Sequence, residues 1–399
     1  MRAAALLLCF IGLSGPSSRA LAGPETNPSI DLVTMGRSPA IFHRWGHAAL
    51  CVVQGGEPEK GVCYNYGAIF PNSAASLAWQ FLRGTARFMV IQQGYMEMLG
   101  IYQREDRTVW IQRMPYSQAQ VDMMVGLLEN DLKEENRYYT YHHMWDNCAT
   151  RLRDHLDRVA GGALRRGSQR TLDVTYRELA QRGMAGMPAL VLGTTLGFGR
   201  GLDRKVTAWA SMGHPDYLRG EVARQTGAEP QRIYERQAAP VPDHPGAGQA
   251  YLAILALLLG LGVVLGRIGR IGRIGRLAEA LPKGLLILLG VVLWLTAAIT
   301  AVPELWKNEA LLVFLPTDVL LFWLAGPRLR LYLRLRLAGL ALVAILLVSG
   351  IFVQPLAAAL LLPALPLLLL HGLPFGPPWL QGTERAPQVP KAPPEKKRR

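Results

Sequence analysis

Apolar residues are distributed differently in two parts of the chain, which meet near residue 250. Beyond this point, long apolar stretches occupy residues 251–266, 284–302, 311–325, 338–353 and 356–370. Each stretch approaches the roughly 17–25 residues that a helix needs to cross a hydrocarbon core of about 30 Å. The fifth contains Pro363 and Pro366, which membrane helices tolerate when neighbours satisfy the freed carbonyl groups. The pattern therefore predicts a membrane domain with about five helices over residues 249–373.

The first residues show the shorter apolar pattern of a secretory signal. Arg2 precedes an apolar run over residues 3–13, and the small residues Ala20 and Ala22 suit cleavage after Ala22. Cys9 lies inside the apolar run, so it leaves with the signal. We expect residues 1–22 to be removed and the chain that follows to be exported.

The exported part, residues 23–237, begins with strand patterns. Short apolar or aromatic runs at residues 48–53 and 61–67 predict two strands, separated by the turn-forming sequence Q-G-G-E-P. A Pro-rich linker over residues 238–248 then leads to the first membrane helix. The exported part is long enough for one compact domain with its own core.

Helical patterns follow the strands, which indicates an α+β domain. Residues 117–135 carry apolar side chains at helical spacing. A further helix is expected to begin at Asp146 or Asn147, since both are good N-cap residues. The apolar residues that would share one face of that helix are Ala149, Leu152, Leu156 and Val159.

Charge separates the two parts as well. The formal net charge is +14, and residues 251–399 hold 16 basic and 6 acidic side chains against 27 and 23 in residues 1–250. Positive charge among apolar helices is typical of membrane proteins, so we expect no nucleic-acid partner. The basic clusters follow the first, third and fifth apolar stretches, which predicts a cytoplasmic side there and a cytoplasmic tail over residues 374–399. These clusters are Arg267, Arg270, Arg273, Arg276 and Lys283; Arg328, Arg330, Arg334 and Arg336; and Lys391, Lys396, Lys397, Arg398 and Arg399.

Cys148, in the sequence W-D-N-C-A-T-R-L-R-D, is a candidate nucleophile. It falls in the first turn of the predicted helix, where free N–H groups and the helix dipole favour a thiolate and lower the sulfur pKa. The same N–H groups can stabilise an oxyanion. A buried structural cysteine is the alternative interpretation.

His47 is the candidate base for this thiol. It opens a predicted strand in H-R-W-G-H, a rigid position from which an imidazole can reach a helix-borne thiol. His43 lies four residues earlier, in a loop. The pair has the spacing of a metal site on a helix, but the sequence continues as a strand and offers no carboxylate at a suitable offset. We therefore expect no bound metal.

The third catalytic residue depends on the register of the two strands. If Cys51 lies opposite Cys63, Asn65 shares a face with His47 and is the preferred group to orient the imidazole. The two cysteines then either form a disulfide or remain small core residues. A slip by one residue would put Tyr64 or Tyr66 in place of Asn65.

Other polar residues allow two interpretations each. His43, Tyr66, Asn147 and Arg151 surround the candidate dyad in sequence and are candidate binding residues. Arg151, together with Arg153 and Asp154, either contacts a phosphate or forms pairs on the helix surface. Asp318, within the third apolar stretch, is either a functional acid in the membrane or an acid at the helix end.

Several of these motifs resemble one family. The order G-H-A-A-L, Y-N-Y-G and N-C-A-T-R-L-R-D is similar to the Lnb N-terminal periplasmic domain, a circularly permuted relative of the NlpC and lecithin-retinol acyltransferase type of papain-like fold. Residues 175–222 and the stretch N-E-A-L-L-V-F-L-P at residues 308–316 are similar to later parts of that family. The resemblance implies a circularly permuted papain-like domain followed by an α-helical membrane domain.

The resemblance also implies an activity. Lnb proteins move an acyl chain from a phospholipid to the α-amino group of the N-terminal cysteine of a lipoprotein, with Cys148 here matching the nucleophile and His47 the base. The expected partners are a phospholipid donor and a lipoprotein acceptor at the bacterial inner membrane, with no cofactor. A membrane-anchored cell-wall amidase or cysteine peptidase of the same fold would use the same dyad. A non-enzymatic assembly factor would have lost it.

Overall fold

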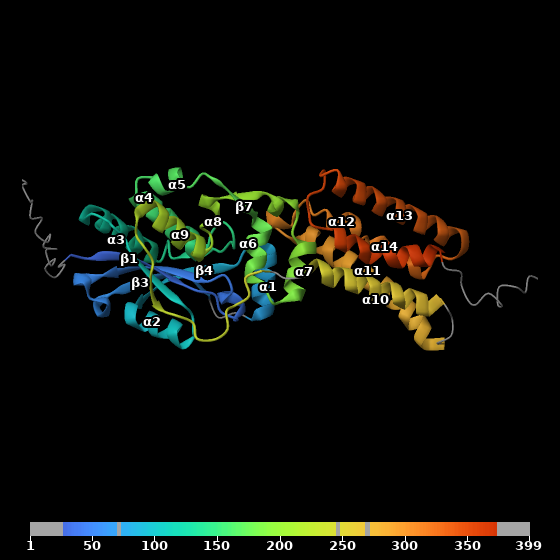
Figure 1. Ribbon diagram of the computed structural model, residues 1–399, viewed down its shortest axis with the longest axis horizontal. Helices are drawn as coiled ribbons and strands as arrows, with labels where there is room; N and C mark the ends of the chain where they lie inside the picture. Colours follow the sequence, from blue (N-terminus) through green and yellow to red (C-terminus); the bar gives the residue numbers. More distant parts are fainter. Residues whose placement is uncertain (1–26, 70–72, 245–247, 268–271, 373–399) are drawn as a thin grey trace, which may run out of the picture.

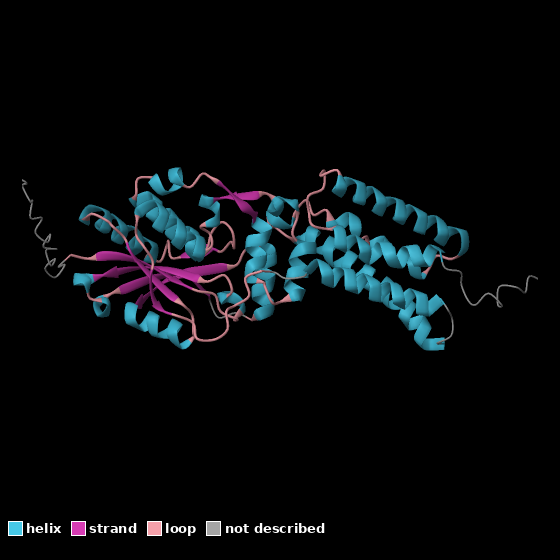
Figure 2. Ribbon diagram, in the orientation of Figure 1, coloured by secondary structure: helices cyan, strands magenta, loops and turns pink. Residues whose placement is uncertain are grey.

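The computed structural model describes residues 27–69, 73–244, 248–267 and 272–372, which form two lobes placed end to end (Figure 1). One lobe combines a sheet with helices, and the other consists mainly of long helices (Figure 2). The mixed α+β class expected for the first lobe is confirmed. The predicted signal peptide at residues 1–22 and the predicted tail at residues 374–399 lie outside the described residues.

A seven-stranded antiparallel sheet forms the centre of the first lobe, with the strand order β6-β4-β3-β2-β1-β5-β9. The two strands predicted from the sequence, β2 and β3, lie in its middle. Strands β7 and β8 form a separate two-stranded sheet. The strands are β1 (Ser29–Met35), β2 (His47–Val53), β3 (Val62–Ile69), β4 (Arg87–Gly94), β5 (Val109–Arg113), β6 (Tyr138–Thr140), β7 (Thr171–Thr175), β8 (Lys205–Thr207) and β9 (Gln231–Tyr234).

Helices cover both faces of the large sheet, because its central strands are apolar on both sides. The ladder pairs Ala49 with Asn65 and Cys51 with Cys63, which confirms the predicted register. Ala48 faces the core under α4, whereas Ala49 and Cys51 face α2. The covering helices are α2 (Tyr95–Arg104) on one side and α3 (Gln118–Leu132), α4 (Cys148–Val159) and α9 (Pro215–Thr226) on the other (Figure 1).

A buried arginine organises the part of this lobe that meets the second lobe. Arg177 pairs with Asp203 at 2.7 Å and donates to the carbonyl oxygens of Thr194 and Phe198. These bonds hold the turn between α7 and β8 in one conformation. The remaining helices of this lobe are α1 (Ala74–Arg83), α5 (Ala163–Gly167), α6 (Tyr176–Gly183), α7 (Pro188–Gly197) and α8 (Ala208–Ser211).

The second lobe is built from apolar helices. Within the described ranges, three of them, Gly248–Arg267, Arg273–Ile299 and Gly326–Val348, are long and apolar enough to cross a membrane. Leu257 on α10 and Leu342 on α13 are more than half exposed, as expected for side chains that face lipid. The long helices are α10 (Gly248–Arg267), α11 (Gly272–Ile299), α13 (Gly326–Val348) and the shorter α14 (Ala357–Gly372).

Two of the predicted membrane helices have different bounds. The helices expected at residues 284–302 and 338–353 begin earlier, at Gly272 and Gly326. Several arginines that we expected in loops therefore lie within α11 and α13. The reason is that Arg, Lys and Leu are all strong helix formers, so the helix continues past the purely apolar window. The arginines concerned are Arg273 and Arg276 in α11 and Arg328, Arg330, Arg334 and Arg336 in α13.

The third predicted membrane helix, at residues 311–325, is wrong as a continuous helix. A single turn, α12 (Ala310–Val313), is followed by a break at Leu315 and by a 3-10 segment, Pro316–Phe322. Pro316 lacks the N–H that an unbroken helix would need there. The broken segment still runs along α11, since Trp294 of α11 donates to the carbonyl oxygens of Leu311 and Phe314, 3.1 Å away in each case.

A buried ion pair supports the broken segment. Arg336 of α13 pairs with Asp318 at 2.7 Å and also donates to the carbonyl oxygen of Val313. The side chain of Asp318 is fully buried, and the hydroxyl of Tyr332 donates to it at 2.8 Å. Asp318 lies in the first turn of the 3-10 segment, with its side chain buried in the ion pair. Arg336 compensates the charge of Asp318 and also donates to the Val313 carbonyl group, which the break leaves without a helical partner.

The Pro-rich segment between the lobes is partly fixed to the first lobe. Asp243 pairs with Arg182 at 2.8 Å and with Arg37 at 3.0 Å. This part of the predicted linker at residues 238–248 is consequently held in place. Residues 245–247 lie outside the described residues.

Candidate active site

Cys148 is the first residue of α4, as the sequence predicts. Asn147 is the N-cap: its side chain accepts a hydrogen bond from the N–H of Thr150, and the Thr150 hydroxyl receives one from the N–H of Asn147. This reciprocal capping ends the preceding loop and starts the helix at the thiol. Cys148 is half-buried and is the free cysteine of the described residues.

The acidity of the thiol differs from the sequence-based expectation. Burial raises the pKa of Cys148 and outweighs the hydrogen-bonding interactions with the N–H groups of Ala48 and Ala149 and the charge of Arg107, which all lower it. The expected lowering of the sulfur pKa at the helix N-terminus is therefore wrong for the resting protein. Loss of hydration destabilises the thiolate by more than the hydrogen bonds from the N–H groups stabilise it. A neutral thiol needs a base close by.

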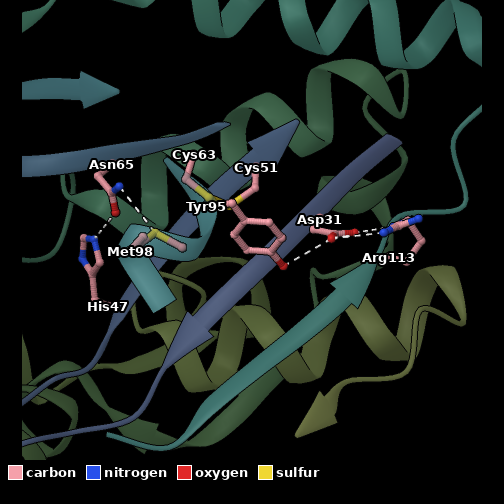
Figure 3. The surroundings of a disulfide bond; sticks show 8 residues. All are labelled: Asp31, His47, Cys51, Cys63, Asn65, Tyr95, Met98 and Arg113. Carbon is pink, nitrogen blue, oxygen red and sulfur yellow. Dashed lines mark hydrogen bonds and ion pairs between the residues drawn. A yellow bond between two sulfur atoms is a disulfide. The ribbon is translucent and has the colours of Figure 1, made fainter. Parts of the chain in front are cut away.

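His47 and Asn65 lie together on neighbouring strands, in the geometry that the predicted register requires (Figure 3). The Nε2 atom of His47 is 3.1 Å from Oδ1 of Asn65. On its other side, the amide nitrogen of Asn65 donates to the sulfur of Met98 at 3.5 Å. A thioether sulfur can only accept, so this contact orients the amide with its oxygen toward the imidazole.

This orientation determines which imidazole nitrogen can act as a base. Because Oδ1 of Asn65 accepts, Nε2 of His47 carries the proton and Nδ1 has a free lone pair. Burial, with a smaller contribution from the charge of Arg107, lowers the pKa of His47 to about 4, while the hydrogen bond to Asn65 opposes the shift. The imidazole is therefore neutral at pH 7 and able to accept a proton.

The backbone brings the two reactive residues close to each other. The N–H group of Ala48, which belongs to the peptide after His47, interacts with the Cys148 thiol. Gly46, just before His47, has a φ of 85°, and a Cβ at this position would lie 2.9 Å from the carbonyl oxygen of Met35. Only glycine fits this close turn into β2. The turn places the start of β2 against the start of α4.

Arg107 is a site residue that the sequence analysis missed. Its guanidinium is fully buried, donates to the carbonyl oxygen of Gly36 at 2.9 Å, and lies 4.7 Å from the centre of the Tyr102 ring. Its charge lowers the pKa of both His47 and Cys148. The sequence E-D-R-T around it is typical of an exposed turn, and no local signal indicates burial.

The candidate binding residues take mainly structural positions. Nδ1 of His43 lies 3.4 Å from a carboxylate oxygen of Glu105, and the hydroxyl of Tyr66 donates to Asp131 at 2.8 Å in the core. Arg151 forms two hydrogen bonds with Asp146 and lies over the Tyr139 ring. Asn147 is the cap described above. Of the predicted residues, Cys148, His47 and Asn65 are those that the fold brings together.

Cys51 and Cys63 form a disulfide between β2 and β3 (Figure 3). Of the two alternatives open from the sequence, the disulfide is the one found. The bond joins β2, which carries His47, to β3, which carries Asn65. On β3, Cys63 lies two residues before Asn65.

Comparison with protein families finds a match over the part of the chain that holds the site. The family model of the Lnb N-terminal periplasmic domain matches residues 29–182. This segment contains His47, Asn65 and Cys148 and makes up less than half of the chain. Comparison with curated proteins and with solved structures gives no significant match. Residues 29–182 therefore form a domain of the Lnb N-terminal periplasmic type, and apolar helices follow it in the chain.

Proposed function

We propose that the protein is a thiol-dependent acyltransferase that moves a fatty acyl chain from a phospholipid to the N-terminal cysteine of bacterial lipoproteins. The observation that carries the proposal is Cys148 at the start of α4, beside the His47–Asn65 pair, in an Lnb domain attached to apolar helices. The match of residues 29–182 to the Lnb domain supports the modification of lipoproteins as the general role. The cysteine chemistry and the donor are the finer part of the proposal.

In the first half-reaction, Nδ1 of His47 accepts the thiol proton while Sγ of Cys148 attacks the ester carbonyl carbon of the phospholipid. The carbonyl oxygen becomes an oxyanion, which the N–H groups of Ala48 and Ala149 near the thiol can stabilise. When the C–O bond breaks, the protonated His47 returns its proton to the leaving alkoxide. A lysophospholipid leaves and an acyl thioester remains on Cys148.

In the second half-reaction, the α-amine of the lipoprotein attacks the thioester. His47 takes a proton from the amine and returns it to the departing sulfur, so the amide forms and the free thiol is restored. A neutral imidazole is required at the start of both halves. The lowered pKa of His47 supplies it at neutral pH.

The second lobe supports a lipid substrate over a cell-wall substrate. The Thr300 hydroxyl donates to the carbonyl oxygen of Leu82, and Arg83 donates to that of Ile299, so the end of α11 is bonded to α1. A simple anchor would need no such contacts with the catalytic lobe. We propose that the site faces the outer surface of the inner membrane, with the C-terminus in the cytoplasm.

Trapping the intermediate tests the reaction class. Full-length protein in membranes is incubated with phospholipid carrying a radiolabelled acyl chain, and label is expected on Cys148 that neutral hydroxylamine releases. Cys148→Ser and His47→Ala should lose the label, because a hydroxyl is a far poorer nucleophile and an unassisted thiol stays protonated. The double variant Cys51→Ala with Cys63→Ala is the matched control and should keep it.

Two outcomes would contradict the proposal. Labelling of Cys148→Ser at the wild-type level would exclude the thioester. An unlabelled wild-type protein that cleaves cell-wall peptides in a Cys148-dependent manner would identify the amidase or peptidase instead.

A further inference from the structure

A carboxylate from the second lobe reaches the loop that leads to the nucleophile. Glu304 lies in the 3-10 turn Pro303–Leu305, between α11 and α12. One carboxylate oxygen is 3.1 Å from Nε2 of His142, and the other accepts the indole N–H of Trp145 at 2.6 Å. The side chain of Glu304 is only 11% exposed. Both partners precede Cys148 by at most six residues.

The loop that Glu304 contacts has a defined shape. The backbones of His142 and Asp146 exchange two hydrogen bonds, of 2.9 and 3.0 Å, which close residues 142–146 into a short turn. The Trp145 ring lies 5.0 Å from that of Tyr176. The turn ends at Asn147, whose side chain caps α4. Any movement of the turn is therefore passed to the first residue of α4, which is Cys148.

The other end of the contact is fixed as well. The carbonyl oxygen of Glu304 accepts the N–H of Gly199 at 2.7 Å. Nearby, Asn308 donates to the carbonyl oxygen of Leu196, and Gln354 donates to that of Phe198. Glu304 thus projects from a backbone that is bonded to the catalytic lobe and cannot drift.

We propose that Glu304 is a positioning residue for Cys148, through which the membrane lobe sets the geometry of the nucleophile. A buried carboxylate that accepts two hydrogen bonds stabilises one arrangement of the turn, since its loss would leave the Trp145 N–H and the His142 ring without these partners. The role of Glu304 in acyl transfer rests on the proposed function. Its effect on the reactivity of the Cys148 thiol does not depend on that function.

The charge state of Glu304 agrees with this role. Burial raises its pKa, but the hydrogen bonds with His142 and Trp145 and the interaction with its own backbone N–H more than compensate, so the pKa lies below its usual value. Glu304 is ionised at neutral pH and holds the turn by charge-assisted hydrogen bonds.

The test compares Glu304→Ala with Glu304→Gln in the full-length, disulfide-intact protein in detergent. Two quantities are measured: the rate of Cys148 alkylation by iodoacetamide at pH 7, and kcat and KM for acyl transfer. Glu304→Ala should lower the alkylation rate and kcat on the order of tenfold, with KM for the phospholipid within about twofold. Glu304→Gln should recover part of both, because the amide oxygen still accepts from Trp145. Nε2 of His142, whose Nδ1 accepts the N–H of Met144, then faces an amide nitrogen and loses its acceptor.

Glu309 provides the matched control. It is a buried carboxylate five residues further on that accepts from the N–H groups of Val353 and Gln354 and pairs with Arg200, without touching the turn before Cys148. Glu309→Gln should lower the melting temperature and leave alkylation of Cys148 within about twofold of wild type. If Glu309→Gln slowed alkylation as much as Glu304→Ala, a general loosening would explain the effect, and the proposal would be wrong.

A second variant covers the case in which Glu304→Ala does not fold. Trp145→Phe removes the indole N–H together with the five-membered ring but keeps a six-membered aromatic ring near Tyr176, and it should lower the alkylation rate and kcat in the same direction. Unchanged alkylation and kcat in a folded Glu304→Ala or Trp145→Phe protein would overturn the proposal. Alkylation that depends on Glu304 in a protein without acyl transfer would support positioning and reject the proposed function alone.

Discussion

At the scale of single residues, the protonation of the candidate base depends on a sulfur atom outside the site. Met98 accepts from the Asn65 amide, and the amide oxygen then accepts from Nε2 of His47. This chain leaves Nδ1 as the basic nitrogen. Asn65 is neutral, so it orients the imidazole without stabilising the protonated form as a carboxylate would.

Replacement of Asn65 by aspartate should therefore change the pH dependence. In the wild type, activity requires neutral His47 and should fall only as the pH drops through about 4, the value to which its pKa is lowered. In Asn65→Asp, the carboxylate favours the imidazolium, and the acid limb of kcat/KM should move up by about one to three pH units. Initial rates between pH 3.5 and 8 measure the limb. An unchanged acid limb would mean that another group controls it.

The lowered pKa of His47 also has a consequence for stability in acid. The folded protein holds this ring neutral, whereas the unfolded chain binds a proton near the ordinary value of 6.5. Protonation of His47 in the unfolded chain therefore lowers the free energy of unfolding as the pH falls from about 6.5 toward about 4. Above pH 6.5 this loss is absent. The kinetic measurements above need a parallel check of folding in the same pH range.

Residues of the site differ in how far the sequence predicts them. Asn65 could be predicted because side chains along paired strands repeat every two residues, so a cysteine pair two residues away sets its face. Arg107 and Glu304 could not, because their partners are distant in sequence and nothing in the residues around them indicates the contact. Burial also reversed the expected shift of the Cys148 pKa, and burial is a property of the assembled fold.

At the scale of elements, the third apolar segment shows how a broken helix can be kept among apolar neighbours. Apolar composition predicts an apolar environment but not helical continuity, which Pro316 interrupts. Side chains of α11 and α13 then replace the missing backbone bonds, with Trp294 and Arg336 as donors. At Gly290 of α11, a Cβ would lie 2.8 Å from the backbone of Leu315, so only glycine permits the close packing at the break.

The ion pair at this break should be needed for stability. Asp318→Leu would leave the buried guanidinium of Arg336 uncompensated and should lower the free energy of unfolding by about 3–5 kcal/mol. The double variant Asp318→Leu with Arg336→Leu removes both charges and should recover much of the loss. Tyr332→Phe, the mild control, loses the hydrogen bonds of the hydroxyl with Asp318 and Thr317 and should cost about 1–2 kcal/mol. Thermal and denaturant unfolding in detergent give the comparison; equal stability of Asp318→Leu and wild type would contradict it.

At the scale of the whole molecule, the two lobes meet at a close-packed interface that tolerates few substitutions. A Cβ at Gly199 would lie 1.8 Å from the carbonyl oxygen of Trp306, so no other residue fits without moving one lobe. Three backbone carbonyl groups of the first lobe, at residues 196–198, accept hydrogen bonds from Asn308 and Gln354. The first lobe is therefore held at one end of the helical lobe (Figure 1).

This arrangement leads to a prediction of topology. With the broken segment and the shorter α14 counted as crossings, we predict that the helical lobe crosses the membrane five times and that its two ends lie in different compartments. Reporter fusions after Gly248 and after Arg399 should report the periplasm and the cytoplasm, respectively. The same compartment for both fusions would show an even number of crossings and would mean that the broken segment enters and leaves on one side.

The position of α7 also determines how the protein can be handled in the laboratory. Leu192 and Leu196 of this helix pack against the apolar cluster of the second lobe, although α7 precedes the linker in sequence. A fragment that ends at the linker would expose this apolar surface of α7 to water. It would also expose the carbonyl groups that accept hydrogen bonds from Asn308 and Gln354. Such a fragment would self-associate at ordinary working concentrations. Detergent or nanodiscs are consequently required for biochemistry on the exported portion, even though its described residues form no helix long and apolar enough to cross a membrane.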